Sequence, residues 1–292
     1  MATTSQWIEG ARPRTLPAAI APVAVGTGLA VSDGNAIAVR ALLALIVAIA
    51  LQIGVNYAND YSDGIKGTDE VRVGPVRLVG QRLATAKHVK LAAFASFAVA
   101  ALAGLVLIAL AGTWWLLIVG VACIAAAWFY TGGKRPYGYL GLGEVFVFVF
   151  FGLVPVLGTE YTQSLMLDAD SIIAAVGVGA LACAILVTNN LRDIPTDIEH
   201  HKRTLAVRLG DGRTRTLYLL LLLLAILAPL VISIKQGSGW ALLALLAFAL
   251  VFRPAAALTR GAKGRELIPV LKATGLATLA YGLLLGLGIA LG

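Results

Sequence analysis

Long apolar stretches separated by short polar segments occupy almost the whole chain. Nine windows of about 18–25 mostly apolar residues can be placed along it. Runs of this length are typical of helices that cross a bilayer, because the hydrocarbon core must be matched by apolar side chains over its full thickness. The windows lie near residues 15–32, 39–58, 89–110, 113–130, 140–158, 171–190, 214–234, 239–258 and 267–291. The pattern therefore predicts an all-α integral membrane protein with nine transmembrane helices.

Composition agrees with this prediction. Of the 292 residues, 59% are hydrophobic and 13% are charged, whereas a soluble domain carries about 25% charged residues. The windows leave no room for an attached soluble domain, so we expect one membrane domain over residues 1–292. Pro17 and Pro22 interrupt the long apolar segment after Arg14, which favours a retained first helix over a signal peptide.

The positive charges lie almost entirely on one side of the predicted helices. Of the 23 Lys and Arg residues, all except Arg40 and Lys235 precede the first window or fall in connections on the same side. Basic residues accumulate on the cytoplasmic side of membrane proteins, so we expect a cytoplasmic amino terminus and an outside carboxyl terminus. This bias explains most of the net charge of +8 without a nucleic-acid partner. The surplus also suits membrane lipid or a diphosphate substrate.

Two clusters of Asn and Asp residues stand at the ends of apolar windows. Asn56, Asp60 and Asp63 are spaced i, i+4, i+7, so they share one face of a helix. A second set, at i, i+3, i+7, begins 134 residues later and consists of Asn190, Asp193 and Asp197. The comparable motifs suggest two related four-helix halves followed by a ninth helix. The polar loops expected after them cover about residues 59–88 and 191–213.

Acids near a membrane are costly and usually functional. A plain alternative is that they are solvated charges at helix ends, but acids at a helix carboxyl end oppose the macrodipole. Two converging acidic faces suit a hard cation such as Mg²⁺, which also binds substrate phosphates. The six motif residues, Asn56, Asp60, Asp63, Asn190, Asp193 and Asp197, are therefore candidate metal ligands. Asp69 is a weaker candidate, since it lies further into the loop.

Basic side chains accompany both acidic clusters, although any one of them could be an ordinary cytoplasmic charge. The run from Tyr130 to Pro136 is more specific, because two glycines let the backbone approach an anion and two cations follow at once. The candidate diphosphate-binding residues are Lys66, Lys134, Arg135, Lys202 and Arg203. Phenylalanines at positions 146, 148, 150 and 151 could be lipid-facing or could line a tunnel for an isoprenoid chain.

Taken together, these motifs resemble the UbiA superfamily of intramembrane aromatic prenyltransferases. The resemblance covers nearly the whole chain and rests on the two acidic motifs and on four flanking segments. These segments are Arg12-Pro13-Arg14-Thr15-Leu16-Pro17-Ala18-Ala19, Gly74-Pro75-Val76-Arg77-Leu78, Pro136-Tyr137-Gly138-Tyr139-Leu140-Gly141-Leu142-Gly143-Glu144, and Lys202-Arg203-Thr204-Leu205. One departure is Gly67, which stands where the wider superfamily has a third acid; Asp69 is displaced from that place.

The resemblance implies a fold, a cofactor and a reaction. Nine helices would surround a central cavity capped by the two cytoplasmic loops, in a bacterial cytoplasmic membrane. Two Mg²⁺ ions, replaceable by Mn²⁺, would help diphosphate to leave a polyprenyl diphosphate while an aromatic ring is alkylated. Asp60, Asp63, Asp193, Asp197 and Lys134 would be the catalytic residues. The Arg-Pro and Gly-Leu-Gly-Glu segments resemble the branch whose acceptor is 1,4-dihydroxy-2-naphthoate, which loses CO₂ and yields demethylmenaquinone.

The acceptor carboxylate needs a cationic partner. The candidate residues for binding the acceptor are Arg12, Arg14, Arg77 and Tyr130.

Three other functions remain open on the residues alone. The same superfamily includes enzymes with other acceptors, such as 4-hydroxybenzoate, homogentisate, haem or a sugar phosphate. CDP-alcohol phosphotransferases share the fragment Asp60-x-x-Asp63-Gly64, but the remainder of their motif is absent. A cation-coupled transporter would place its acids near mid-bilayer in broken helices, whereas these acids stand at helix ends beside basic loops.

Overall fold

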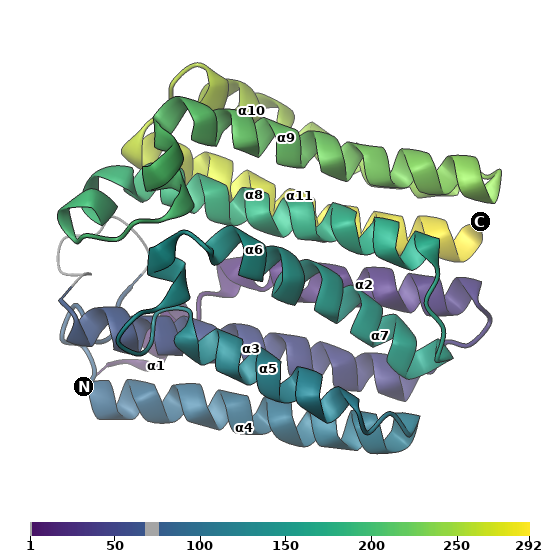
Figure 1. The fold of residues 1–292 in the computed structure, drawn as a ribbon, viewed down its shortest axis with the longest axis horizontal. Coiled ribbons are helices and arrows are strands. Elements are labelled where there is room, and N and C mark those ends of the chain that lie inside the picture. Colours follow the sequence, from purple (N-terminus) through teal and green to yellow (C-terminus); the bar gives the residue numbers. More distant parts are fainter. Residues whose placement is uncertain (1, 68–75) are drawn as a thin grey trace.

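The computed structural model describes residues 2–67 and 76–292, and these residues form helices, turns and loops without a strand. The helices run side by side in a bundle (Figure 1). In chain order they are α1 Thr4–Gly10, η1 Pro13–Thr15, α2 Pro17–Ser32, α3 Ala38–Ile65, α4 Ala86–Ala111, α5 Leu116–Phe129, η2 Tyr137–Leu140, α6 Gly143–Val147, η3 Phe148–Leu153, α7 Val154–Ser164, α8 Ala169–Glu199, α9 Leu205–Gln236, η4 Trp240–Leu250, α10 Phe252–Thr259, η5 Gly264–Glu266 and α11 Leu267–Leu291. The predicted all-α class is confirmed for the described part of the chain.

Several of these helices are long and apolar enough to cross a membrane. Among the described residues six qualify alone, and up to eight qualify if each bent pair counts as one span. The bent pairs are Thr4–Thr15 with Pro17–Ser32, at 49°, and Trp240–Leu250 with Phe252–Thr259, at 51°. The window at 113–130 corresponds to the 14-residue helix α5, which is short for a span. A multi-pass membrane protein is therefore established, and the count of nine spans stays a prediction.

Both motif-bearing helices extend further than their apolar windows. Helix α3 continues to Ile65 and α8 continues to Glu199, so all six motif residues lie on helix. Helix α9 already begins at Leu205 and is interrupted at Gly210, whose φ of 77° breaks the helical path. The expected long loop over 191–213 is therefore wrong. Helix continues there because buried polar side chains find hydrogen-bond partners, which hydropathy does not detect.

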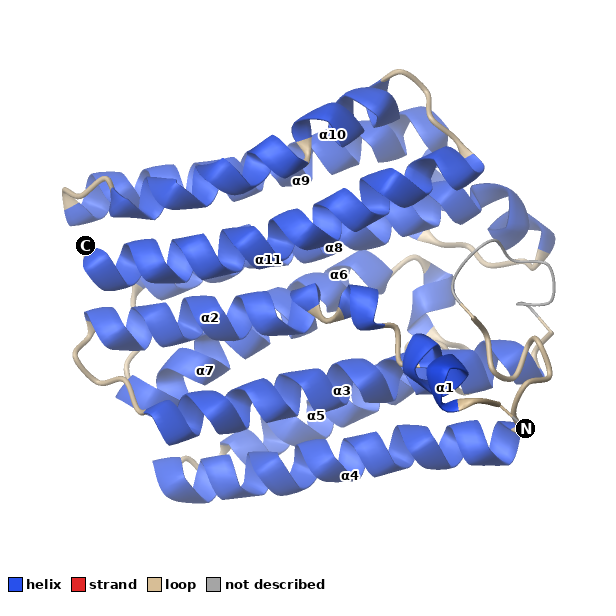
Figure 2. Cartoon of the chain, turned by 180° about the vertical axis from the view of Figure 1, so that it is seen from behind, coloured by secondary structure: helices blue, strands red, loops and turns tan. Residues whose placement is uncertain are grey.

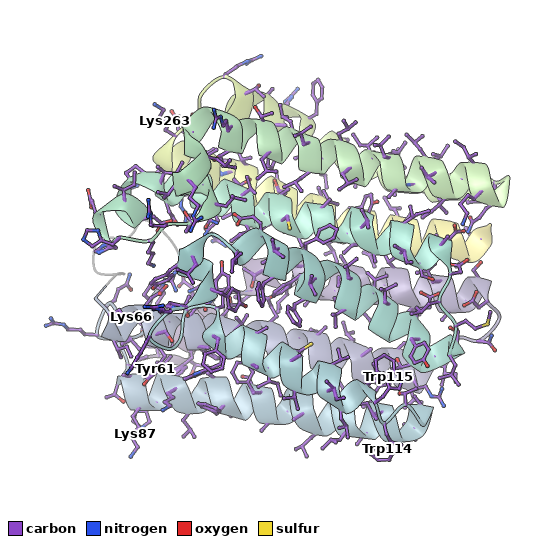
Figure 3. The ribbon with its side chains drawn as sticks, in the orientation of Figure 1. Tyr61, Lys66, Lys87, Trp114, Trp115 and Lys263 are labelled. Atoms are coloured by element: carbon purple, nitrogen blue, oxygen red, sulfur yellow. The ribbon has the colours of Figure 1, made fainter. Side chains whose placement is uncertain are left out.

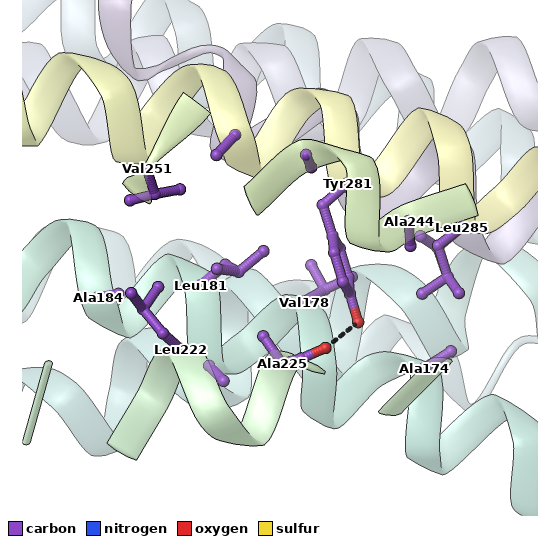
Figure 4. Close-up of a cluster of buried hydrophobic side chains, with 14 of the residues drawn as sticks. Ala174, Val178, Leu181, Ala184, Leu222, Ala225, Ala244, Val251, Tyr281 and Leu285 are labelled. Atoms are coloured by element: carbon purple, nitrogen blue, oxygen red, sulfur yellow. Dashed lines mark hydrogen bonds between the residues drawn. The ribbon is translucent and has the colours of Figure 1, made fainter. Parts of the chain in front are cut away.

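Helices α8 and α11 occupy the middle of the bundle, between α9 on one side and α2 on the other (Figures 1 and 2). The main core of buried apolar side chains forms around α8, α9 and α11. Pro229 inside α9 has no N–H to give to the carbonyl of Ala225 four residues earlier. The hydroxyl of Tyr281 on α11 donates to that carbonyl at 2.9 Å (Figure 4). A buried polar group that lipid could not satisfy is thus paired inside the protein.

Candidate functional site

A small polar pocket lies at the end of the bundle where α3 and α8 finish, the end marked by Lys66 in Figure 3. Its volume is about 80 Å³. The lining combines acids, carboxamides, hydroxyls and three cations: Arg12, Asn59, Asp63, Arg77, Tyr130, Thr131, Gly138, Tyr139, Asn189, Asn190, Asp197, Lys202 and Thr204. The two acidic motifs, far apart in the sequence, therefore contribute to one pocket.

Asp63 is the carboxylate that the first motif presents to this pocket. It is buried, accepts a hydrogen bond from the hydroxyl of Tyr139, and lies 3.7 Å from the Nζ of Lys202. The Nζ atoms of Lys66 and Lys202 lie 4.9 and 4.6 Å from the centre of the Tyr139 ring. Lys66 Nζ also donates to the backbone carbonyl of Thr131 at 2.6 Å. Tyr139 therefore links the acid to two ammonium groups.

The surroundings of Lys66, which lies just beyond the end of α3, lower its pKa. Partial burial lowers the pKa of Lys66 below its ordinary value, and nearby Lys202 adds to the effect. Asp63 opposes it by favouring the charged form. Closely spaced cations thus repel one another at the pocket, and an anionic ligand would reduce that repulsion.

The second motif contributes Asn190 and Asp197 to the pocket. The amide nitrogen of Asn190 donates to Glu144 Oε1 at 3.0 Å, so its carbonyl oxygen is the atom left for a ligand. Asp193 instead pairs with Arg192 through two bonds, Nε to Oδ1 at 2.7 Å and Nη2 to Oδ2 at 2.8 Å. Arg192 therefore occupies both carboxylate oxygens of Asp193.

Asp60, the remaining acid of the first motif, forms hydrogen bonds with the backbone of another segment. Asp60 is 1% exposed and accepts the backbone N–H groups of Leu78, at 2.7 Å, and Val79, at 3.1 Å. These bonds tie the segment that carries Arg77 to α3. Asn56 lies beside a second, apolar cavity and donates to Ala11 and Thr15. Neither Asp60 nor Asp193 lines the polar pocket.

The predicted cations divide into two groups. Arg12, Arg77 and Lys202 line the polar pocket, with Lys66 against its edge. Arg12 is held in the left-handed region at φ 55°, a strained conformation that is common at functional sites. The other predicted cations are exposed on the surface and line neither cavity: Arg14, Lys134, Arg135 and Arg203. Asp69 lies outside the described residues, as do Gly74 and Pro75 of the flanking segment.

An apolar cavity of about 510 Å³ runs along α2, α3, α4, α5 and the α6–α7 segment. It shares Asn59 and Tyr130 with the polar pocket, so the two spaces meet there. An aromatic chain of Tyr130, Tyr137, Phe146 and Phe150 lines the cavity, with successive ring centres 5.5, 3.9 and 5.9 Å apart.

Of the phenylalanines that could face lipid or line a tunnel, Phe146, Phe150 and Phe151 line this cavity. Trp114 and Trp115, in contrast, are exposed at the opposite end of the bundle (Figure 3).

The polar pocket has the donor chemistry of a Mg²⁺ site that is completed by phosphate. Mg²⁺ usually takes one or two carboxylates and fills its other positions with water and phosphate oxygens. Asp63 and Asp197 reach the pocket from two different helices, and Asn190 offers a carboxamide oxygen. Within residues 2–67 and 76–292, three or more His, Cys, Asp or Glu side chains do not converge into a metal cage. The residues thus fit an ion that a phosphate ligand helps to hold.

Comparison with known proteins decides the family. Residues 19–271 match the UbiA prenyltransferase family. The chain belongs to this family. Membership in this prenyltransferase family excludes the phosphotransferase and transporter alternatives.

Relatives and solved structures agree with the assignment. Over 292 residues, the chain is 58% identical to a 1,4-dihydroxy-2-naphthoate octaprenyltransferase of Mycobacterium tuberculosis, covering 100% of this chain and 99% of the relative. The fold resembles an apo UbiA homologue from Aeropyrum pernix K1, with a TM-score of 0.72 at 15% identity, covering 94% and 97% of the two chains. It also resembles a UbiA homologue from Archaeoglobus fulgidus bound to GPP and Mg²⁺, with a TM-score of 0.68 at 12% identity, covering 94% and 99%.

Several residues of the site were not predicted as functional from the sequence, and Tyr139, Glu144 and Arg192 make the most informative contacts among them. Tyr139 and Glu144 belong to the quoted Gly-Tyr-Leu-Gly-Leu-Gly-Glu segment, and Arg192 lies inside the second motif. A glutamate inside the apolar window at 140–158 was the available signal for Glu144, because a buried acid requires a partner. No spacing rule pointed to Asn190 as that partner.

Proposed function

We propose that this UbiA-family enzyme transfers a polyprenyl group from polyprenyl diphosphate to 1,4-dihydroxy-2-naphthoate, with loss of CO₂ and diphosphate, forming demethylmenaquinone. The observation that carries the proposal is the meeting of the polar pocket and the apolar cavity at Asn59 and Tyr130. A prenyl diphosphate has the same division, with a charged head and an apolar chain. The naphthoate acceptor is supported by the full-length similarity to the mycobacterial relative.

The diphosphate head occupies the polar pocket in this proposal. Lys202 in the pocket and Lys66 at its edge neutralise its charge, which grows as the allylic C–O bond breaks. Bound Mg²⁺, as two ions, adds charge neutralisation of the leaving group. Asp63, Asp197 and Asn190, which line the pocket, would hold these ions together with the phosphate oxygens. The homologue bound to GPP and Mg²⁺ supports this choice of cofactor.

The other motif residues act around this centre. Asp60 positions Arg77 through the backbone of the following residues, since it accepts their N–H groups. Asp193 would contribute to the ion site when its bonds to Arg192 open, and the Arg192 guanidinium would then be available to the diphosphate. Asn56, the third candidate ligand of the first motif, lies in the lining of the apolar cavity. Lys134, Arg135 and Arg203 guide the anionic donor from the surface toward the pocket.

The prenyl chain lies in the apolar cavity, where water is excluded from the allylic cation. Faces of the aromatic chain from Tyr130 to Phe150 attract positive charge and can stabilise that cation at the mouth of the cavity. The electron-rich ring of the acceptor attacks there. Arg12 and Arg77 are the best-placed candidates for its carboxylate, because Arg14 lines neither cavity.

We further propose that the site end of the bundle faces the cytoplasm of a bacterial cell, with the amino terminus cytoplasmic and the carboxyl terminus outside. The positive charges at this end support that orientation. The donor and acceptor are then met at the cytoplasmic surface, and the lipophilic product enters the surrounding lipid.

The direct test is turnover by the purified protein in detergent with Mg²⁺, labelled geranylgeranyl diphosphate and 1,4-dihydroxy-2-naphthoate. We expect a lipophilic naphthoquinone and release of CO₂, both abolished by EDTA. Transfer to 4-hydroxybenzoate or homogentisate instead of the naphthoate would overturn the acceptor while leaving the enzyme class. Folded protein that transfers to no phenol would overturn the function itself.

A further inference from the structure

Gln52 is a polar side chain in the wall of the apolar cavity. It lies on α3 one turn before Asn56 and is 5% exposed. Its amide nitrogen donates to Thr15 Oγ1 at 2.9 Å. Its amide oxygen, Oε1, is buried and has no hydrogen-bond partner among the described residues. An orphaned acceptor on a residue in the wall of a binding cavity points to a ligand that donates a hydrogen bond.

Neighbouring hydrogen bonds determine which amide atom is left over. The single proton of Thr15 Oγ1 is donated to the carbonyl of Arg12 at 2.9 Å. Thr15 can therefore only accept from its other neighbours, and it does so from both Gln52 and Asn56. Asn56 is held further by its bond to the carbonyl of Ala11. The nitrogen of Gln52 must face Thr15, which leaves the oxygen as the amide atom without a partner on a residue that lines the cavity.

The chemistry of the reactants selects one partner for this oxygen. An isoprenoid chain has no hydrogen-bond donor, and an ionised diphosphate offers only acceptors. The aromatic acceptor is the reactant that carries donors, since its ring hydroxyls are phenolic. It must also approach the place where the diphosphate bond breaks, at Asn59 and Tyr130. Gln52 is two turns of α3 from Asn59, roughly 10 Å along the helix axis, and both residues line the apolar cavity.

We propose that Gln52 Oε1 accepts a hydrogen bond from a ring hydroxyl of the aromatic acceptor and so helps to determine acceptor specificity. The inference rests on the proposed function, because it requires a hydroxylated ring as substrate. It places the acceptor against α3 and the turn between α1 and α2, with Arg12 and Arg77 beyond it at the polar end. The prenyl chain then takes the side of the cavity formed by α5 and the α6–α7 segment.

The test compares ring analogues as competitive inhibitors of the wild-type protein and of Gln52→Met, which keeps the shape but removes the acceptor oxygen. The analogues are 1-hydroxy-2-naphthoate and 4-hydroxy-2-naphthoate, each lacking one hydroxyl. We expect wild type to bind one analogue at least about ten-fold more weakly than the other, as sites that pair a hydroxyl do. In Gln52→Met this preference should fall below about two-fold, while KM for the prenyl diphosphate stays unchanged.

Thr15→Val is a second test of the same bond, because it keeps the Gln52 oxygen but removes the partner that orients the Gln52 amide. The preference between analogues should weaken in this variant too. An undiminished preference in Gln52→Met, or a change in the KM for prenyl diphosphate alone, would overturn the proposal in favour of an ordered water or a chain contact. Gln52→Asn, which withdraws the oxygen, must show the same loss if Gln52→Met fails to fold.

Failure of the proposed function has a different signature. If wild type rejects 1,4-dihydroxy-2-naphthoate but accepts another phenol, the same comparison is made with that phenol and its deoxy analogue. Loss of the preference would then support Gln52 as a hydroxyl ligand although the naphthoate assignment is wrong. Wild-type protein that transfers to no phenol would reject both.

Discussion

Hydrogen-bond partners outside the acidic motifs determine which atoms the motif residues present to ligands. Asn190 turns its nitrogen toward Glu144, and Asn56 turns its nitrogen toward Ala11 and Thr15. A carboxamide binds a metal through oxygen, so in the proposed function these partners leave the oxygen of each side chain for coordination. Glu144 is 8% exposed and therefore has little access to water as an alternative partner.

Replacing Glu144 should separate this orienting bond from the charge of the carboxylate. A glutamine at this position would still accept from Asn190, whereas an alanine would not. We expect Glu144→Ala to lower kcat/KM by about 10- to 100-fold, the usual effect of losing a residue that orients a ligand, and to raise the Mg²⁺ concentration needed for half-maximal rate. Glu144→Gln should keep most of the activity. Equal losses in the two variants would show that the carboxylate charge matters rather than the bond.

Lys66 should make donor binding sensitive to alkaline pH. Its pKa is lowered by burial, so the ammonium loses its proton at a lower pH than an ordinary lysine does. Below that pH the charge attracts diphosphate, and as the pH rises through the lowered pKa we expect KM for the prenyl donor to rise. Lys66→Arg, which stays charged, should lack this rise. A rise of the same size in both proteins would assign it to another group.

The stability contribution of Lys66 has the opposite sign. Between its lowered pKa and its ordinary value, the unfolded chain binds more protons at this residue than the folded protein does. Stability therefore rises with pH over that interval while donor affinity falls. Thermal unfolding followed over the same pH series distinguishes a local loss of charge from general alkaline denaturation.

At the scale of elements, close helix packing depends on residues without side chains. A Cβ atom on Gly28 of α2 would lie 2.2 Å from the carbonyl oxygen of Gly286, and one on Gly286 of α11 would lie 2.4 Å from that of Ala24. Small residues let helix backbones approach in this way inside membranes. The contact holds together the two helices that border the α1–α2 turn of the site.

Gly286→Ala should therefore destabilise the protein although alanine favours helix. We expect a loss of about 1–3 kcal/mol, the usual cost of overpacking, seen as a lower Tm in detergent. Gly120→Ala on α5 is the control, since a Cβ there meets nothing within 4 Å. Both changes bring the same gain in helix propensity. A Tm for Gly286→Ala equal to or higher than that of Gly120→Ala would therefore show that the α2–α11 contact is not tight.

Sequence spacing was informative about helix faces but not about what covers them. The i, i+4, i+7 pattern placed Asp60 and Asp63 on one face, and both are buried on α3. Only Asp63 reaches the pocket, because the segment at Leu78 and Val79 covers Asp60. Such a tertiary contact leaves no periodic signal. The apolar windows located the helices, but two windows ended at 58 and 190, whereas the helices continue to Ile65 and Glu199. Hydropathy follows the apolar character of side chains and does not detect a helix that continues with polar residues.

At the scale of the whole molecule, the cavity relates helix α5 to the length of the bound chain. Tyr130, just after α5, stands at the meeting point of the two spaces, and Gly120 lines the cavity further along the same helix. The ten residues between them correspond to roughly 15 Å of helix. A prenyl chain that begins at the polar pocket must pass Tyr130 first and reaches Gly120 only if it is long.

A large side chain at residue 120 should therefore discriminate between donors by length. We expect Gly120→Phe to leave kcat/KM for dimethylallyl or geranyl diphosphate within about two-fold, because short chains leave that part of the cavity empty and lose no apolar contact there. With geranylgeranyl and longer donors it should fall at least about ten-fold, since each methylene displaced from an apolar site costs free energy. Ala122→Phe, on the exposed face of α5 and outside the cavity lining, should change neither. Uniform losses across all donors would place the chain elsewhere in the molecule and would remove α5 as the element that limits its length.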